Sequence, residues 1–445
     1  MFRSGVCWVP SPAGIHAALI LLGTIVACWP GLSSAAGSDD IDRKLDDIDR
    51  RLHQIEEEGR HVDDSGHLDK ALNPAISVIL DGVYASYKND PDDYNLPGFM
   101  LGGDAGLAPE GFSLGHSEII FSGNIDDIFF GKLSVALSEH DNDIEVELEE
   151  AFFETLSLGG GFNIRGGRFY SAIGYLNQQH RHVWDFYDAP LVYRGLFGDQ
   201  YFDDGLRLSY AAPTDIFIKL GVEALSGRKY PAGGEHNGVG NWTAFASIGG
   251  DIGNSHFWQA GLSYMSADDI EREQAGHEHS AAAEEVPLFT GDSRISGANA
   301  IYEWRPDGDH HDRNVKLQFE YFNREENGNI TLLNSSPVET STLDSNQDGW
   351  YLQATWQFAH SWRTGIRYDM LDSDNNGSDP GVLDEAGLLT NGHRPERASI
   401  MVEWIPGQYS RIRLQYNRDD SYQLPDDQVY LQYTFSLGSH TAHTH

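Results

Sequence analysis

The amino-acid sequence predicts an all-β fold: a transmembrane antiparallel β-barrel of about 16 strands, preceded by a short N-terminal coiled-coil helix. Apolar and polar residues alternate along many segments, as where Val429, Leu431 and Tyr433 alternate with Tyr430 and Gln432. A period of two places each set on one face of a strand, so the apolar set would face lipid and the polar set the lumen. Short and long connections also alternate along the chain, as is typical of barrels with tight turns at one end and long loops at the other.

The alternation marks sixteen strand segments in chain order. They lie near residues 76–87, 114–125, 128–139, 145–157, 161–170, 203–212, 215–226, 240–252, 255–267, 289–305, 313–325, 346–359, 361–372, 396–405, 408–419 and 426–437. The pattern breaks at Leu148-Glu149-Glu150, which predicts a β-bulge. An even number of strands near sixteen is wide enough to enclose an aqueous lumen.

The composition excludes several other classes of protein. Of 445 residues, 40% are hydrophobic and 11% are aromatic, too many for a disordered chain. The net charge of -38 disfavours nucleic acid as a partner, because its phosphates would be repelled. Cys7 and Cys28 are the only cysteines, and both fall in the N-terminal segment, so no disulfide or thiol chemistry is expected beyond it.

The N-terminus has the three parts of a secretory signal: Arg3, the apolar run 17–27 and small residues at 33–36. A retained anchor helix is the alternative, but the apolar run is short for one. The predicted segments are a signal peptide at 1–36, a coiled-coil helix at 37–58, a linker at 59–73, an outer-membrane β-barrel at 74–438 and a His-rich C-terminal tail at 439–445.

The coiled-coil helix is predicted from Ile41, Leu45, Ile48, Leu52 and Ile55, whose 4-3-4-3 spacing is a heptad seam. Two heptads are too few to be stable alone in water. The seam therefore favours partner chains, and a homotrimer joined through the barrel and the coil would supply them. A charged helical spacer explains the same residues equally well, and both interpretations stay open.

The polar face of the strands predicts the wall of the lumen, which is mixed in charge and slightly basic. The long connection at 171–202 is the candidate constriction, by analogy with the third loop of general porins. The predicted constriction and pore-lining residues are Lys132, Arg165, Lys219, Glu223, Lys316, Glu320, Arg363, Arg367, Arg411 and Arg413 on the wall, with Asp185 and Arg194 in the loop. The ion selectivity stays open, because charges at the narrowest point decide it.

Several of the 19 histidines are grouped near carboxylates. His180, His182 and Asp185 form the candidate metal site, since imidazole and carboxylate together suit Zn²⁺. Zinc would be a transported or regulatory ion here, and surface histidines in polar loops are the alternative explanation. Further groups are His277 with His279, His310 with His311, and His440, His443 and His445 in the tail. No nucleophile–base pair or GxSxG-type element is present, so neither enzymatic activity nor a resident cofactor is predicted.

Five stretches resemble a known family. They are NPAISVILDGVYASY at 73–87, ELEEAFFETL at 147–156, RGGRFYSAIGYLNQQHRHVWDFYDAPLVYRGLFG at 165–198, RLQYNRD at 413–419 and YLQYTFSLGSHTAH at 430–443. The chain is similar to the zinc-regulated outer-membrane porins, often labelled TonB-dependent receptors, and more distantly to phosphate-selective and siderophore porins. The resemblance implies metal uptake under zinc shortage. The receptor label implies a plug domain, for which the chain ahead of the first strand is too short.

Together these observations predict a passive, porin-like channel in the outer membrane, with both termini in the periplasm. Its expected partners are outer-membrane lipid and a small solute, such as zinc or a metal complex. The alternative is a plugless receptor that binds a metal complex or siderophore at its extracellular loops.

Overall fold

The computed structural model describes residues 74–102, 105–140, 143–156, 158–274, 286–306, 313–422 and 424–438. The predicted signal peptide, coiled-coil helix, linker and His-rich tail lie outside these residues, as do His277, His279, His310 and His311.

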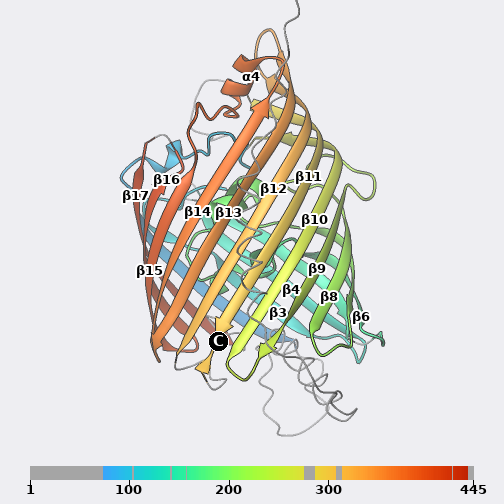
Figure 1. Cartoon of the computed structure of the whole chain (residues 1–445), viewed down its shortest axis with the longest axis vertical. Coiled ribbons are helices and arrows are strands. Elements are labelled where there is room, and N and C mark those ends of the chain that lie inside the picture. The colour runs from blue at the N-terminus through green and yellow to red at the C-terminus, as the bar shows by residue number, and fades with distance from the viewer. Residues whose placement is uncertain are drawn as a thin grey trace, which may run out of the picture. The chain divides into compact units, whose positions relative to one another are not determined.

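The described strands form one closed antiparallel barrel, in which neighbours along the chain pair and the last strand pairs with the first (Figure 1). Two short segments, β2 and β3, occupy one strand position because both pair with β1, so the described barrel has sixteen strands, as predicted. The strands are β1 (Ala75–Ser86), β2 (Gly111–Leu114), β3 (Ser117–Asn124), β4 (Phe129–His140), β5 (Asp143–Thr155), β6 (Phe162–Tyr170), β7 (Phe202–Ala211), β8 (Phe217–Leu225), β9 (Asn241–Ile252), β10 (His256–Glu273), β11 (Val286–Trp304), β12 (Asn314–Leu333), β13 (Glu339–Ala359), β14 (Trp362–Asn376), β15 (Glu396–Gly407), β16 (Ser410–Asp420) and β17 (Asp426–Gly438).

The interruption between β2 and β3 falls at Gly115 and His116. Gly115 donates its N–H to the backbone oxygen of Asp81 on β1, and a Cβ at Gly115 would lie 2.2 Å from the Asp81 carboxylate. Glycine allows this approach without displacing the Asp81 carboxylate. The chain therefore turns locally, and the alternation of inward and outward side chains is reset before Ser117 and Glu118, which are both buried.

The predicted bulge in β5 is present. Ser134 on β4 is paired with Glu150, while Val135 is paired with Leu148, so Glu149 is an extra residue. A bulge of this kind places two consecutive side chains on one face of a strand. Glu149 and Glu150 are accordingly both buried, at 2% and 4% exposure.

The two ends of the barrel differ in their connections, as predicted. At one end they are short, at 125–128, 212–216, 253–255, 360–361 and 408–409; at the end that carries helix α4 (Pro380–Glu385) they include the long segments 87–110, 171–201, 226–240 and 377–395. Two connections at the α4 end, 141–142 and 334–338, are short as well.

The predicted boundaries are wrong for β10 to β14, which are longer than expected. The expected loop at 326–345 is mostly a continued hairpin, because β12 runs to Leu333 and β13 starts at Glu339. The outward side chains of this extension are polar, as at Glu325, Asn327 and Asn329. Hydropathy alternation fails there because the outer face has no apolar row to mark it.

The interior is apolar toward the α4 end, where the predicted polar-inward pattern is wrong. Phe289, Phe322, Ile330, Leu343 and Leu371 on the strands are each at most 4% exposed. They form one hydrophobic core with side chains from two segments that enter the barrel, 94–102 and 171–201. Among the described residues, no helix is both long and apolar enough to cross a membrane.

Candidate functional site

The connection between β6 and β7, residues 171–201, folds inside the barrel. It contains the short helices η2 (Leu176–Gln178), η3 (Arg181–Val183) and α3 (Leu191–Phe197). Every residue of α3 is buried, which fits its almost wholly apolar sequence LVYRGLF. Gly198 ends α3 in the left-handed conformation at a φ of 63°, and glycine adopts that conformation without strain. We call residues 171–201 the lumen loop.

Two glutamates of the wall hold the start of the lumen loop. Glu320 on β12 is 0% exposed and accepts hydrogen bonds from the N–H of Tyr175 at 2.6 Å and of Leu176 at 3.0 Å, and from the Tyr193 hydroxyl at 3.0 Å. Glu223 on β8 accepts from Ala172 N–H at 2.9 Å. Both carboxylates therefore satisfy donors that burial would otherwise leave unpaired.

Two aspartates in the middle of the lumen loop bind the wall at β12, β14 and β15. Asp185 forms ion pairs with Lys316 at 3.1 Å and with Arg363 at 2.8 Å. Asp188 forms ion pairs with Arg367 and Arg397, both at 2.8 Å.

Two side-chain amides of the wall also contact Asp188. Gln415 and Asn417 donate hydrogen bonds to the Asp188 carboxylate at 2.7 and 2.8 Å. Both aspartates are buried. The loop carboxylates are thus fully engaged with the basic residues of β12, β14 and β15 and the amides of β16.

These contacts keep both aspartates ionised. Burial would raise the pKa of Asp185, but Lys316 and Arg363 hold that pKa well below its usual range. Burial likewise opposes the charge on Asp188, and Arg397 and Arg367 lower the pKa of Asp188 in the same way. Because both folded-state values are depressed, the ion pairs contribute fully above the ordinary aspartate value of 3.8 and weaken only as the pH falls further.

A second set of contacts joins the loop to β3 and β5 and uses the two strand irregularities. His182 Nδ1 lies 2.8 Å from Glu118 Oε1, and His180 Nδ1 lies 2.7 Å from Glu118 Oε2. His116, at the β2–β3 interruption, places Nε2 2.8 Å from Glu149 Oε1 in the bulge. We call these five residues the His–Glu cluster.

Glu150 lies beside the His–Glu cluster and has its own cation. Its Oε2 is 2.7 Å from Lys132 Nζ and 2.9 Å from His180 Nε2. Burial opposes a proton on His180, but the Glu118 carboxylate outweighs burial and raises the pKa of His180 to about 10. Burial prevails at His182, whose pKa is lowered. The carboxylates around His180 therefore stabilise a positive charge on that side chain.

The described residues 94–102 form a second insertion, which lies against the lumen loop. The Tyr230 hydroxyl is 3.0 Å from the backbone oxygens of both Met100 and Gly195, so it connects the two insertions. Arg324 on β12 donates to the same hydroxyl at 2.9 Å. The sequence marked this stretch only as part of a connection, because its apolar residues follow no period.

We expect the Tyr230→Phe variant to fold with a free energy of unfolding lower by about 1–2 kcal/mol, because one hydrogen bond is lost and the Arg324 donor loses its acceptor. Urea unfolding of the refolded barrel in detergent measures this difference. Tyr409→Phe is the control, since Tyr409 is 42% exposed on the outer wall. Equal losses in both variants would contradict a specific role for the Tyr230 contact.

The structure places the predicted pore-lining residues on the inner face, but many of them contact the lumen loop and not open space. Lys132, Glu223, Lys316, Glu320, Arg363, Arg367 and Arg413 each contact it. Arg411 pairs with Glu403 at 3.0 Å and also donates to the Trp184 backbone oxygen of the loop at 3.5 Å. Arg165 pairs with Glu154, and Arg194 with Asp199 within the loop at 3.1 Å. Lys219 pairs in register with Ala211 and Ser247.

Of the predicted metal site, the structure brings His180 and His182 together but gives Asp185 to Lys316 and Arg363. Sequence reasoning missed His116, Glu149, Glu150 and Arg397. The broken alternation at Leu148-Glu149-Glu150 was a usable signal for two of them, because a bulge changes which face a residue occupies.

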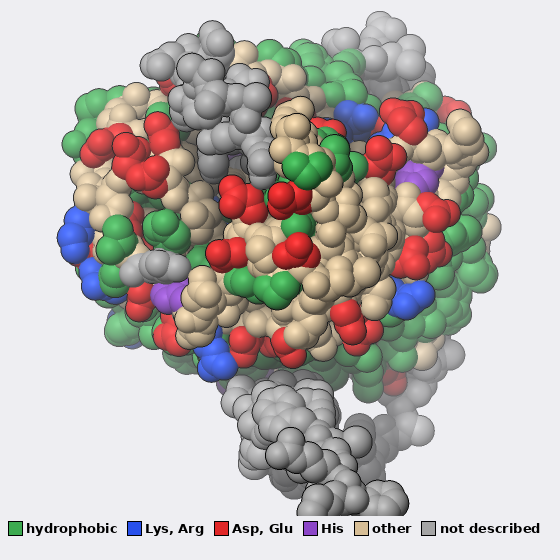
Figure 2. All heavy atoms as spheres, turned by 90° about the horizontal axis from the view of Figure 1, so that it is seen from above, with side chains coloured by type: hydrophobic (Ala, Val, Ile, Leu, Met, Phe, Trp, Pro, Cys, Tyr) green, Lys and Arg blue, Asp and Glu red, His purple; other side chains and the backbone are tan. Residues whose placement is uncertain are grey.

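The mouth at the α4 end is acidic. Figure 2 shows this face from above, with acidic side chains gathered on it and few Lys or Arg among them. Exposed members at this end include Asp268, Asp269, Asp374, Asp379, Asp384 and Glu385. A cation approaching the described part of the barrel from this side meets a favourable field.

No family model matches the chain. A protein of Aquifex aeolicus (strain VF5), described as uncharacterized, is 28% identical over 406 residues, which cover 84% of this chain and 80% of that protein. Among solved structures, the outer-membrane channel DcaP of Acinetobacter baumannii is similar with a TM-score of 0.52 and 13% identity, over 84% of this chain and 99% of that one. This chain has the fold of an outer-membrane channel.

A loop L8 deletion mutant of OmpT, an outer-membrane protein of Vibrio cholerae, is similar too, with a TM-score of 0.50 and 11% identity over 82% of this chain and 99% of that one. At such identities the likeness concerns the fold. The closed barrel matches outer-membrane proteins in architecture.

Proposed function

We propose that the protein is a passive outer-membrane channel whose lumen loop keeps the pathway narrow, so that only small solutes pass. The observation that carries this proposal is the path of the lumen loop. It crosses the interior and bonds to the wall at Glu118 on β3, Glu223 on β8, Glu320 on β12 and Arg367 on β14. The shared fold with an outer-membrane channel supports it.

The solute that the chemistry favours is a metal ion such as Zn²⁺, or a small metal complex. The acidic mouth attracts cations, and the His–Glu cluster offers imidazole nitrogen and carboxylate oxygen inside the barrel. The resemblance to zinc-regulated porins agrees with this choice. Passage would require the lumen loop to shift, because its contacts surround the cluster.

A plugless receptor is the second candidate, and the filled interior favours it. The insertion 94–102 and helix α3 form a hydrophobic core with strand residues such as Phe322 and Leu371. A receptor would capture a metal complex at the α4 end without a standing conductive path.

Two further features belong to the same proposal. The α4 end would face outside and both termini the periplasm, as in barrels with long outer loops.

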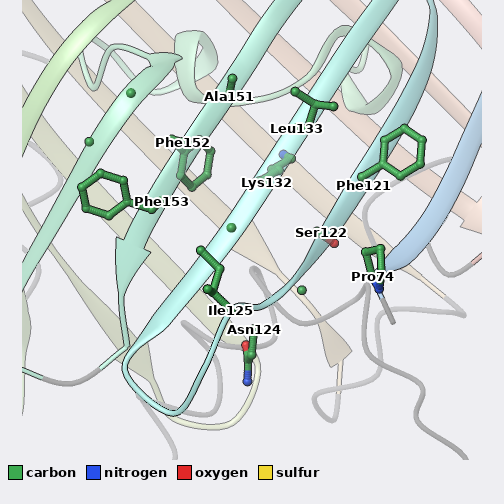
Figure 3. A pocket seen from close by; sticks show the side chains of 14 residues that line it. Pro74, Phe121, Ser122, Asn124, Ile125, Lys132, Leu133, Ala151, Phe152 and Phe153 are labelled. Atoms are coloured by element: carbon green, nitrogen blue, oxygen red, sulfur yellow. The ribbon is translucent and has the colours of Figure 1, made fainter. Parts of the chain in front are cut away.

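The barrel would assemble as a homotrimer through its outer wall. Figure 3 shows an apolar depression in the wall formed by β3 to β6, where glycines leave room beside Phe121, Leu133 and Phe153. Cross-linking in native membranes tests the trimer.

Single-channel recording of the refolded protein in planar bilayers tests the function. We expect small, discrete conductance steps and a reversal potential that shows cation preference, because the mouth is acidic. Liposome swelling should admit small sugars slowly and exclude larger ones. A barrel that is folded, as shown by heat-modifiable gel mobility, yet electrically silent would contradict the channel and favour the receptor.

A further inference from the structure

The His–Glu cluster brings five potential metal ligands together from separate parts of the chain. Ligand atoms of Glu118, His180 and His182 all lie within 4.8 Å of one another, and so do those of His116, Glu118 and Glu149. The two groups share Glu118. Four of the five residues are buried, and His182 is only 1% exposed.

Two nitrogens of the cluster have no hydrogen-bond partner. They are Nε2 of His116 and Nδ1 of His180, both buried. Each meets a carboxylate oxygen, at 2.8 and 2.7 Å, as an ion-pair contact without hydrogen-bond geometry. Buried polar atoms normally find a well-directed partner. A cation bound in either ligand group would give its nitrogen such a partner.

The charges of the cluster suit a divalent ion. Lys132 lies against Glu150 at 2.7 Å and balances that carboxylate. Glu118 and Glu149 remain, with two negative charges, beside imidazoles whose protons a bound metal ion would displace. Imidazole nitrogen with carboxylate oxygen selects Zn²⁺ and similar borderline metals over Mg²⁺ or Ca²⁺, which prefer oxygen alone.

We propose that the His–Glu cluster is a Zn²⁺-type divalent metal site that latches the lumen loop to the barrel wall and so regulates the channel. His180 and His182 belong to the loop, whereas His116, Glu118 and Glu149 belong to the wall. A metal that needs ligands from both sides binds only the docked loop, and by mass action it stabilises that state. The regulatory part rests on the proposed channel function; the binding part does not.

Calorimetric titration of the refolded mature protein with ZnCl₂ tests the site. We expect the tightest Zn²⁺ affinity to fall by about tenfold or more in both Glu118→Gln and His182→Gln, since even indirect ligand partners account for 10–100-fold. The control is His256→Gln, because His256 contacts Tyr302 on the far wall. Other histidines remain in every variant, so their background cancels. Unchanged affinity in both cluster variants, with heat-modifiable mobility preserved, would overturn the site.

Bilayer recording with and without Zn²⁺ tests the latch. Zn²⁺ should reduce the open probability of the wild type and His256→Gln, and leave Glu118→Gln and His182→Gln unaffected; Mg²⁺ should have no effect on any. If Zn²⁺ binds through the cluster but conductance stays the same, the latch is overturned while the channel stands. If the protein is silent throughout, the channel proposal fails, and protease cleavage of the lumen loop decides: Zn²⁺ must protect the wild-type loop, and no protection overturns the latch.

Discussion

In the Asp188→Asn variant we expect the single-channel conductance to rise at least about twofold and the selectivity to shift toward anions. Asp188 receives two guanidinium groups and two side-chain amides, all within 2.8 Å. An asparagine can accept on one oxygen only, and it leaves Arg367 and Arg397 to share Asp369, at 2.9 and 3.4 Å, as their remaining acidic partner. Removing one member of a buried ion pair costs about 3–5 kcal/mol. The loop can avoid most of that loss by leaving the wall, which exposes the two arginines to the lumen.

The control for this experiment is Asp384→Asn, which makes the same charge change at an exposed position in α4. It should keep the wild-type conductance. A folded Asp188→Asn barrel with unchanged conductance and reversal potential would show that the loop is not the element that limits flow. Lowering the pH to 5 should not mimic the variant, because the pKa of Asp188 is held below its usual range.

In the Glu320→Ala variant we expect the lumen loop to become sensitive to protease while the barrel stays closed. Glu320 is completely buried and accepts from two backbone N–H groups and from the hydroxyls of Tyr193 and Tyr351. Each buried donor left without an acceptor costs about 1–3 kcal/mol. The pairing of β12 with β11 and β13 does not depend on this side chain. The substitution should therefore destabilise the docked lumen loop and leave the barrel intact.

Limited proteolysis followed by mass spectrometry locates the cleavage, and heat-modifiable gel mobility reports on the barrel. Glu325→Ala on the same strand is the control, because Glu325 is exposed. Glu320→Gln should be intermediate, since its amide oxygen still accepts. Cleavage confined to connections other than 171–201 would contradict an anchoring role for Glu320.

The positions of all sixteen strands could be predicted from the sequence because most strands have one face toward lipid. Leu414, Tyr416 and Leu431 are examples of outward side chains that stay 41–48% exposed. The extensions of β10 to β14 could not be predicted, since polar side chains such as Asn327 and Asn346 lie outward there. The period-two alternation of apolar and polar residues disappears where the outward side chains are polar and face water.

The candidate site was predictable only in part. The spacing of His180 and His182, and the length of the loop that carries them, drew attention to the right segment. Their partners lie on strands 30 to 64 positions away in the chain, from the pairing of His180 with Glu150 to that of His182 with Glu118. Which carboxylate reaches them depends on the bulge at Glu149 and on how the loop crosses the lumen, and neither is a local property.

The unequal lengths of the strands make the entrance one-sided. β13 has 21 residues and β8 has 9, which at about 3.4 Å per residue and a tilt of about 40° rise about 55 and 23 Å. Since the apolar band of such barrels is about 25 Å tall, β8 only about matches it, whereas β13 rises about 30 Å more. Figure 1 shows the longer strands extending toward α4. The rim of the described barrel is therefore lower on the β8 side than on the β13 side. In the orientation that we propose, this low rim would lie close to the membrane surface, so lipid sugars and head groups beside it would be the first groups that a solute meets there.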